Sequence, residues 1–263
     1  MNLDFPLILT AATLFTGMVT LVDWLYSRKQ GKLENMHVLI EYSRAFFPVL
    51  LAVLVIRSFL FQPYRVPTGS LEPTVMPGDL ILVDQFQYGL KLPVYDTQIV
   101  PISEPKTGQI ALFYYPVNHA LTFVKRVLGV PGDRISYINK VFYINGKKMN
   151  QTYVGDALDS DGSGNFWPVK VYRENLEGIE HDIYVRSDVP ARNFYNLIVP
   201  KNKYFMIGDN RDGSDDSRYW GFVPEQDFIG RALYVWFSWD SEASLWSKVR
   251  WDRIGNKLYG NTH

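Results

Sequence analysis

The sequence predicts a mainly β protein: a coiled antiparallel sheet or barrel-like domain with an inserted β-ribbon cap, tethered by two N-terminal transmembrane helices. Two observations support this prediction. Two long apolar stretches lie near the start of the 263-residue chain. After them, short apolar runs alternate with Gly, Pro, Asn and Asp, a pattern typical of antiparallel strands and turns.

Both apolar stretches have the properties of membrane spans. Residues 5–22 contain no charged side chain and approach the length of about 20 residues that crosses a bilayer. A cleaved signal peptide is one alternative, but only Asp4 precedes this stretch instead of a basic region, and a buried core helix is the other. Residues 45–61 contain Pro48 and, near one end, Arg57, whose long side chain can reach the headgroups. We therefore expect two spanning helices.

The charges around these stretches predict an orientation. Arg28, Lys29 and Lys32 lie between the two stretches, whereas no Lys or Arg precedes the first. Short loops rich in Lys and Arg stay on the cytoplasmic side. We therefore expect residues 1–61 to form a membrane anchor with a short cytoplasmic loop. Both termini and the rest of the chain would then lie on the extracytoplasmic side.

The remaining chain is expected to fold as a β domain in two parts around an insert. The Asn145-Gly146 dipeptide predicts a type I′ hairpin turn. Residues 137–200 are polar and turn-rich, which predicts a β-rich cap with a flexible tip at residues 155–166. The first part of the domain would be residues 62–136 and the second part residues 201–263. The predicted strands are residues 79–86, 109–115, 121–130, 134–146, 203–209 and 229–239.

Composition excludes several classes of function. The chain has 27 Lys plus Arg and 27 Asp plus Glu, so its zero net charge gives no reason to expect a nucleic-acid partner. The absence of cysteine excludes disulfide scaffolds, thiolate zinc sites and cysteine nucleophiles. The four histidines have no metal-ligand spacing. We therefore expect no metal and no cofactor.

The first segment that could carry chemistry contains Ser70, in PYRVPTGSLEPTVMPGD directly after the second apolar stretch. Pro67 and Pro73 exclude a regular helix there, and Gly69 permits close approach of another backbone. A Gly-Ser pair between prolines is ordinarily only a turn. Ser70 becomes a nucleophile only if a base lies beside it.

Two residues are candidates for that base. His119 would complete a Ser–His–Asp site with Ser70. The other candidate is Lys125, which strand alternation places on one face with Phe123 and Val127. A lysine with apolar neighbours is either an exposed edge residue or a desolvated base, whose pKa falls from about 10.4 towards 8. The residues alone leave both pairings open.

The third segment is IGDNRDGSDDSRYWG, residues 207–221. Its Asp, Asn and Gly content suggests a calcium loop, but no frame has the required spacing. The alternatives are a turn held by Asp–Arg pairs and side-chain hydrogen bonds, or the same rigid turn placing a serine hydroxyl against a base.

In this order after two apolar stretches, the three segments resemble the bacterial type I signal peptidases (leader peptidases), a family of Ser–Lys dyad serine peptidases. The resemblance extends over essentially the whole chain and is weakest in the first stretch and in the insert. It implies a membrane-bound serine endopeptidase that removes N-terminal signal peptides from exported preproteins through an acyl-enzyme. The implied location is the bacterial cytoplasmic (inner) membrane, with the catalytic domain on the periplasmic side. The implied partners are signal peptides and the lipid bilayer, with the secretion translocon as a further candidate.

The resemblance also implies a role for individual residues. Ser70 would be the nucleophile and Lys125 the general base. The backbone N–H of Ser70 and the hydroxyl of Thr68 would form the oxyanion hole, and Ser214 would orient Lys125. Leu71 stands where the family usually has Met, and Thr68 where Ser is common, but neither change removes a chemical group. The implied supporting residues are Asp209, Arg211, the Asp216–Arg218 ion pair and Arg126, and the implied substrate pocket is formed by Tyr64, Val66, Val75 and Val124.

Two rival functions stay open at this point. One is a different Ser–Lys peptidase, either a conjugation-type processing enzyme or a self-cleaving repressor-like protein. The two apolar stretches and the GDNRD segment argue against the repressor. The other is a membrane-anchored β-domain that binds extended peptides without cleaving them.

Overall fold

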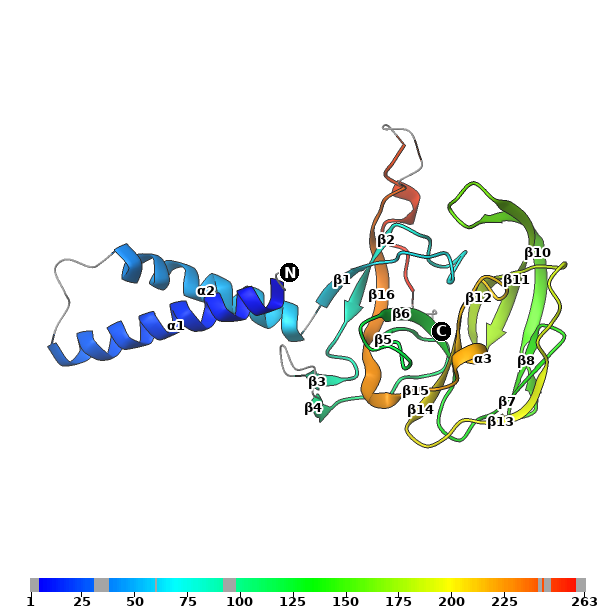
Figure 1. The fold of residues 1–263 in the computed structure, drawn as a ribbon, viewed down its shortest axis with the longest axis horizontal. Helices are drawn as coiled ribbons and strands as arrows, with labels where there is room; N and C mark the ends of the chain where they lie inside the picture. The colour runs from blue at the N-terminus through cyan, green and yellow to red at the C-terminus, as the bar shows by residue number, and fades with distance from the viewer. Residues whose placement is uncertain are drawn as a thin grey trace. The chain divides into compact units, whose positions relative to one another are not determined.

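A computed structural model describes residues 5–30, 38–59, 61–91, 98–240, 243 and 247–258. The chain divides into two compact units. One contains Met1–Gln62 and Gly89–Pro101, and the other contains Pro63–Tyr88 and Ile102–His263. Figure 1 shows the two apolar helices in the first unit and the strands that make up most of the second.

Both predicted spans are helical. Helix α1 extends over Phe5–Gln30 and α2 over Val38–Phe59, and each is long and apolar enough to cross a membrane. Both helices are longer than the predicted stretches, because helix formation continues through flanking polar residues that a charge-free window leaves out. The second stretch was predicted to end at residue 61, but Phe61 begins a strand. The predicted cytoplasmic loop falls partly on residues 31–37, including Lys32, which lie outside the described residues.

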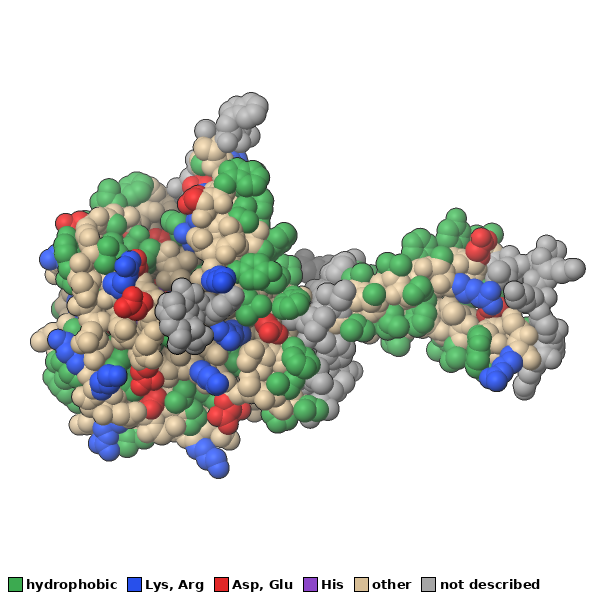
Figure 2. Space-filling model, turned by 180° about the vertical axis from the view of Figure 1, so that it is seen from behind, with side chains coloured by type: hydrophobic (Ala, Val, Ile, Leu, Met, Phe, Trp, Pro, Cys, Tyr) green, Lys and Arg blue, Asp and Glu red, His purple; other side chains and the backbone are tan. Residues whose placement is uncertain are grey.

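The two helices pack side by side (Figure 1). A Cβ atom at Gly17 of α1 would lie 2.7 Å from the Phe47 ring of α2, so glycine permits this close approach. Asp23 of α1 is buried and forms an ion pair with Arg44 of α2. Figure 2 shows hydrophobic side chains over much of the visible helix surface, with charged ones gathered towards one end. An apolar exterior with an internal polar contact fits helices surrounded by lipid.

The second unit is built on a seven-stranded antiparallel sheet that curls into a half-barrel (Figure 1). Its strand order is β1-β2-β16-β5-β6-β14-β15, so β6 lies inside the sheet, between β5 and β14. The fold class is as predicted. The strands are β1 (Phe61–Arg65), β2 (Asp79–Asp84), β5 (Ile110–Tyr114), β6 (Thr122–Gly129), β14 (Lys203–Ile207), β15 (Val223–Pro224) and β16 (Phe228–Ser238).

One predicted strand is in fact a hairpin. Residues 134–146 were expected to form a single strand but form β7 (Arg134–Ile138) and β8 (Val141–Ile144). They are joined at Asn139 and Lys140, which both have left-handed backbone conformations, with φ of 49° and 68°. A two-residue turn keeps the period-2 alternation in phase, which explains why the pattern alone did not reveal it. The predicted turn at Asn145-Gly146 is confirmed, with φ of 52° and 81°.

The predicted insert, residues 137–200, lies in two smaller sheets, one of which begins earlier, at Arg134 of β7. The first has the order β10-β11-β12 and the second the order β13-β7-β8-β9. The predicted tip at residues 155–166 is shorter than expected, because β10 continues to Ser160 and β11 begins at Phe166. Asp161 organises the turn between them by accepting a hydrogen bond from the Ser163 amide at 2.8 Å. The strands are β9 (Lys147–Lys148), β10 (Asn150–Ser160), β11 (Phe166–Leu176), β12 (Ile179–Val185) and β13 (Phe194–Ile198).

Short elements complete the described chain. A separate β-ladder joins β3 and β4 in the first unit. The helix α3 follows β14 and is a single turn. The bounds are β3 (Gly89–Lys91), β4 (Gln98–Pro101), α3 (Ser217–Trp220) and the 3-10 helices η1 (Glu225–Asp227) and η2 (Trp251–Arg253).

Candidate active site

Ser70 lies in the turn between β1 and β2, which we call the nucleophile turn (residues 68–75). The Glu72 amide donates to the Gly69 carbonyl at 3.0 Å, and the Val75 amide donates to the Leu71 carbonyl at the same distance. The side chains of Leu71 and Val75 are buried in one hydrophobic cluster. Because the apolar residues after Ser70 anchor the turn in the core, the Ser70 side chain is held on a fixed backbone.

Lys125 lies on β6, with its side chain against Ser70. Its Nζ atom forms a hydrogen bond with Ser70 Oγ. The two residues are only 4% and 9% exposed. Since β6 is flanked by β5 and β14, Lys125 is not an edge residue, and that alternative is wrong. The structure thus joins two residues that are 55 positions apart in the sequence.

The surroundings of Lys125 favour its neutral form. Burial lowers the pKa of Lys125 from 10.5 to about 8, although the nearby carboxylates of Asp216, Asp215 and Asp209 act in the opposite direction. The Phe123 ring centroid lies 5.5 Å from Nζ. Near pH 8, Lys125 is therefore neutral in a substantial fraction of the protein molecules, and in these it can accept a proton.

His119 does not take the place of Lys125 in this arrangement. Its Nε2 atom lies 3.2 Å from Asp227 Oδ2, and its side chain is 60% exposed. Lys125 is the basic side chain hydrogen-bonded to Ser70 Oγ.

Ser214 lies beside the nucleophile turn. A Cβ atom at Gly208 would be 2.2 Å from Ser214 Oγ and 2.4 Å from the Ser70 carbonyl oxygen, so glycine is needed where the segments meet. Within the described part of the chain, Ser214 Oγ is buried and has no hydrogen-bond partner. Its expected hydrogen bond to Lys125 stays a prediction. Thr68 is exposed at the start of the turn, and its oxyanion role also stays a prediction.

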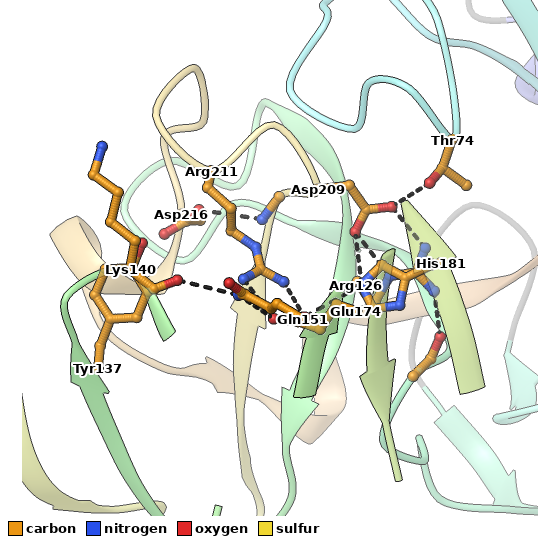
Figure 3. A network of polar contacts seen from close by, with 12 residues as sticks. Thr74, Arg126, Tyr137, Lys140, Gln151, Glu174, His181, Asp209, Arg211 and Asp216 are labelled. Carbon is orange, nitrogen blue, oxygen red and sulfur yellow. Dashed lines mark hydrogen bonds and ion pairs between the residues drawn. The ribbon is translucent and has the colours of Figure 1, made fainter. Parts of the chain in front are cut away.

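The next pair fixes the GDNRD loop, residues 208–212, to β6. Arg126 holds Asp209 in a two-pronged ion pair, with distances of 2.8 Å from Nε to Oδ1 and 2.6 Å from Nη2 to Oδ2. Thr74 donates its hydroxyl to the same carboxylate at 2.5 Å. Burial alone would raise the pKa of Asp209, but Arg126, together with His181 and Thr74, outweighs burial and holds that pKa below its usual range. Figure 3 shows how Asp209 thereby links β6 to the nucleophile turn.

Asp216 and Arg218 form a second ion pair shortly after this loop. Arg218 donates from Nε and Nη2 to the two carboxylate oxygens, each at 2.8 Å. Asp216 also accepts from the Gly208 amide at 3.1 Å and caps α3. The pair therefore connects the start of the loop, at Gly208, to the segment that follows Ser214.

The insert supplies partners that sequence reasoning missed. Arg211 and Glu174 of β11 are both fully buried and form an ion pair, with Nη1 donating to Oε1 at 2.9 Å. Gln151 also donates to Glu174, at 2.9 Å. Nε2 of His181 on β12 lies 3.5 Å from Glu174 Oε2 and 3.8 Å from Asp209 Oδ1 (Figure 3). The sequence contains no signal that separates Glu174 from the exposed acidic residues of the same ribbon.

Backbone hydrogen bonds reinforce this docking. The Tyr184 amide of β12 donates to the Asp209 carbonyl at 3.0 Å, and the Arg211 amide donates to the Tyr184 carbonyl at 2.9 Å. The GDNRD loop therefore extends the ladder of the insert. The position of the GDNRD loop therefore depends on the seven-stranded sheet and on the insert.

The C-terminal segment supports the nucleophile turn from another direction. Arg253 donates to the Thr74 carbonyl at 3.0 Å and binds the buried Asp79 carboxylate at 2.7 Å. Arg250 contacts the same carboxylate at 3.5 Å. Sequence reasoning did not assign these arginines to the site.

The predicted pocket residues lie close together. Val66, Val75 and Val124 belong to the cluster that contains Leu71, and Tyr64 packs against it. The hydroxyl of Tyr64 donates to the Thr122 carbonyl at 3.1 Å. Their contact with substrate stays a prediction. Among the residues that the structure describes, no group of His, Cys, Asp and Glu side chains could hold a metal ion.

The sequence of this chain is similar to those of known signal peptidases. The family model described as signal peptidase, peptidase S26, matches residues 39–239. Signal peptidase I of Pseudomonas aeruginosa is 38% identical to this chain, over 91% of the chain and 94% of that protein. The chain belongs to the signal peptidase I family. Within this family, signal peptidase I of Pseudomonas fluorescens is 36% identical, over 97% of this chain and 99% of that protein.

A crystal structure of a signal peptidase I from Enterococcus faecalis V583 also matches, with 30% identity and a TM-score of 0.30. The match covers 49% of this chain and 97% of that chain. The family model and the two Pseudomonas relatives confirm the family predicted from the three sequence segments.

Proposed function

We propose that this protein is a membrane-tethered serine endopeptidase that removes signal peptides from exported preproteins, with Ser70 as nucleophile and Lys125 as general base. One observation carries the proposal: a buried lysine with a lowered pKa forms a hydrogen bond with the hydroxyl of a serine on a fixed turn. Membership of the signal peptidase family supplies the substrate class.

The proposed reaction begins with neutral Lys125. Its Nζ atom takes the hydroxyl proton of Ser70 as Oγ bonds to the carbonyl carbon of the scissile peptide, and the carbonyl electron pair moves onto oxygen. The Ser70 amide and the Thr68 hydroxyl would stabilise that oxyanion, each donor contributing about 2.7–4 kcal/mol in comparable sites. The C–N bond then breaks, and the Lys125 ammonium returns the proton to the leaving amine.

Hydrolysis of the acyl-enzyme completes the cycle. Lys125 removes a proton from water, the resulting hydroxide attacks the ester carbonyl, and Ser70 Oγ leaves and is reprotonated. Ser214 is proposed to orient Lys125, because its buried hydroxyl lies beside the nucleophile turn without another partner in the described chain. The substrate would bind as an added strand, with small side chains against the surface around Tyr64 and Val124.

The proposed location is the bacterial inner membrane. Helices α1 and α2 have the length and apolar exterior of spanning segments. The positive charges at the end of α1 and directly after it, including Arg28, favour a cytoplasmic connection. The catalytic domain and both termini would then face the periplasm. Signal peptides and the bilayer are the proposed partners, and the secretion translocon is a candidate for a third.

The test is cleavage of a purified preprotein by the full-length protein in detergent, with the new N-terminus read by mass spectrometry. We expect Ser70→Ala and Lys125→Met each to lower kcat by at least about a thousandfold. Matched controls are Ser163→Ala and Lys170→Met, which change exposed residues of the insert. Cleavage by either active-site variant at the control rate would disprove the dyad. Peptide binding without cleavage by the wild-type protein would instead support a binding module.

A further inference from the structure

Glu72 is a buried carboxyl group that the proposed reaction does not use. It follows Ser70 by two residues and is 8% exposed. Its side chain folds back against the nucleophile turn, since a Cβ atom at Gly69 would lie 2.7 Å from Glu72 Oε1. A charge on Glu72 would therefore develop close to the backbone that carries the nucleophile.

The partner of Glu72 is a second carboxyl group, Asp159 at the end of β10. Asp159 is 2% exposed, and it acts with burial to raise the pKa of Glu72. Asp159 also accepts from Trp167 Nε1 at 2.9 Å and from Asn210 Nδ2 at 2.8 Å. Two carboxylates repel each other strongly in a buried site, so the proximity of Asp159 favours a proton on one of the pair.

Asn210 connects this pair to Ser70. The Asn210 amide donates to the Ser70 carbonyl at 3.1 Å, and its side chain lies 3.3 Å from the Gly69 carbonyl. Glu72, Asp159 and Asn210 thus form a continuous path from the insert to the nucleophile. Each of the three comes from a different segment: the nucleophile turn, the insert and the GDNRD loop.

The charges around the pair keep the proton on Glu72. Burial is the largest cause and Asp159 the next, and together they raise the pKa of Glu72 from 4.5 to about 8. Arg253 and Arg250 of the C-terminal segment act in the opposite direction. Tyr184 of β12 also faces both carboxyl groups, and Arg186 interacts with Asp159.

We propose that Glu72 and Asp159 share one proton, and that this proton holds the insert against the nucleophile turn and keeps Ser70 in place for Lys125. Glu72 is then a positioning residue for the reaction proposed above, on which this inference rests. Loss of the proton puts two adjacent carboxylates in a buried site, and their repulsion separates Asp159 and Asn210 from the turn.

This arrangement restricts activity from both sides of the pH scale. Lys125 must lose a proton to act as base, whereas Glu72 must keep one to position Ser70. The profile of kcat/KM against pH is therefore bell-shaped, and the alkaline limb belongs to the carboxyl pair. A merely structural role of Glu72 would not produce such a limb.

The test compares preprotein cleavage by wild type and Glu72→Gln between pH 6 and 10, using the full-length protein in detergent. Gln matches Glu72 in shape and can donate to Asp159, but it cannot ionise. Above its alkaline midpoint, wild-type kcat/KM is expected to fall about tenfold per pH unit. We expect Glu72→Gln to shift that midpoint upward by at least about one unit. Glu177→Gln, which removes an exposed carboxyl of the insert, should leave the alkaline limb unchanged.

A second measurement on the same samples does not depend on activity. The infrared spectrum at pH 7 should contain the C=O band of a protonated carboxyl group in wild type and in Glu177→Gln, but not in Glu72→Gln. That band should disappear as the pH rises through about 8. A wild-type spectrum without the band, or superimposable alkaline limbs in wild type and Glu72→Gln, would overturn the proposal. Absence of any Ser70-dependent cleavage would instead contradict the proposed function. The infrared spectrum alone would then decide whether Glu72 and Asp159 share a proton.

Discussion

Replacing Glu174 by Gln would measure how strongly the insert holds the GDNRD loop. Glu174 and Arg211 are both fully buried, so the variant leaves the Arg211 guanidinium without its counter-charge. Breaking one partner of a buried ion pair costs about 3–5 kcal/mol. Stacking of Arg211 on Phe142, at 5.1 Å from the ring centroid, does not compensate for a missing charge. We expect the free energy of unfolding to fall by about that amount, and preprotein cleavage to fall with it.

The assay is urea unfolding of the full-length protein in detergent, followed by tryptophan fluorescence. Glu177→Gln serves as the control, because a surface substitution should change stability by less than about 0.5 kcal/mol. Replacing both Glu174 by Leu and Arg211 by Met should recover most of the loss, since neither charge is then left unpaired. A loss below about 1 kcal/mol for Glu174→Gln would refute the reasoning.

The pH dependence of this loss follows from the pKa of Glu174. Burial alone would raise that pKa, but Arg211 and His181 outweigh it and hold it well below its usual range. A carboxyl group whose pKa is lower in the folded protein than in the unfolded chain stabilises the folded protein. This stabilisation is complete at pH values above the pKa of the group in the unfolded chain. It is lost as the pH falls towards the pKa of the group in the folded protein. The loss should therefore persist at both pH 6 and pH 8.

Three further predictions concern the site itself. Lys125→Met should raise the free energy of unfolding at pH 7 by up to about 3 kcal/mol, because it removes a buried charge. This gain should shrink between pH 8 and pH 10.5, where the folded wild type loses its proton before the unfolded chain does. Gly208→Ala should abolish cleavage and destabilise the fold by about 1–3 kcal/mol, because the new methyl group overlaps Ser214 Oγ and the Ser70 carbonyl. Thr68→Val should lower kcat about 100- to 1,000-fold with little change in KM, whereas Thr68→Ser should retain activity. An unchanged kcat for Thr68→Val would show that Thr68 is not part of the oxyanion hole.

Features encoded in short stretches of sequence were predictable. A charge-free window found both apolar helices, and alternation with turn residues found most strands of the main sheet. Their ends were less accurate, as the late start assigned to α2 illustrates, because helices continue through flanking polar residues. The family was accessible because its segments around Ser70, Lys125 and Ser214 are each local.

Features that depend on tertiary docking were not predictable. Whether Lys125 was an edge residue or a desolvated base depended on the strand order β5-β6-β14, which a strand pattern does not encode. Glu174, His181 and Asp159 lie on a polar, turn-rich ribbon, where acidic residues ordinarily face solvent. Only the position of the ribbon against the GDNRD loop buries them. The role of the insert could therefore not be read from its own sequence.

The central claim is that neutral Lys125 is the base for Ser70, and the acidic limb of the pH–rate profile tests it most directly. The measurement is kcat/KM for preprotein cleavage by wild type and His119→Gln across pH 5–9. We predict that both profiles keep rising up to about pH 8 before ionisation of the carboxyl pair lowers them again, because burial lowers the pKa of Lys125 to about that value. A histidine base ordinarily titrates between about pH 6 and 7. If wild-type kcat/KM rose only in that range, and His119→Gln lost the rise, the role of Lys125 would be contradicted.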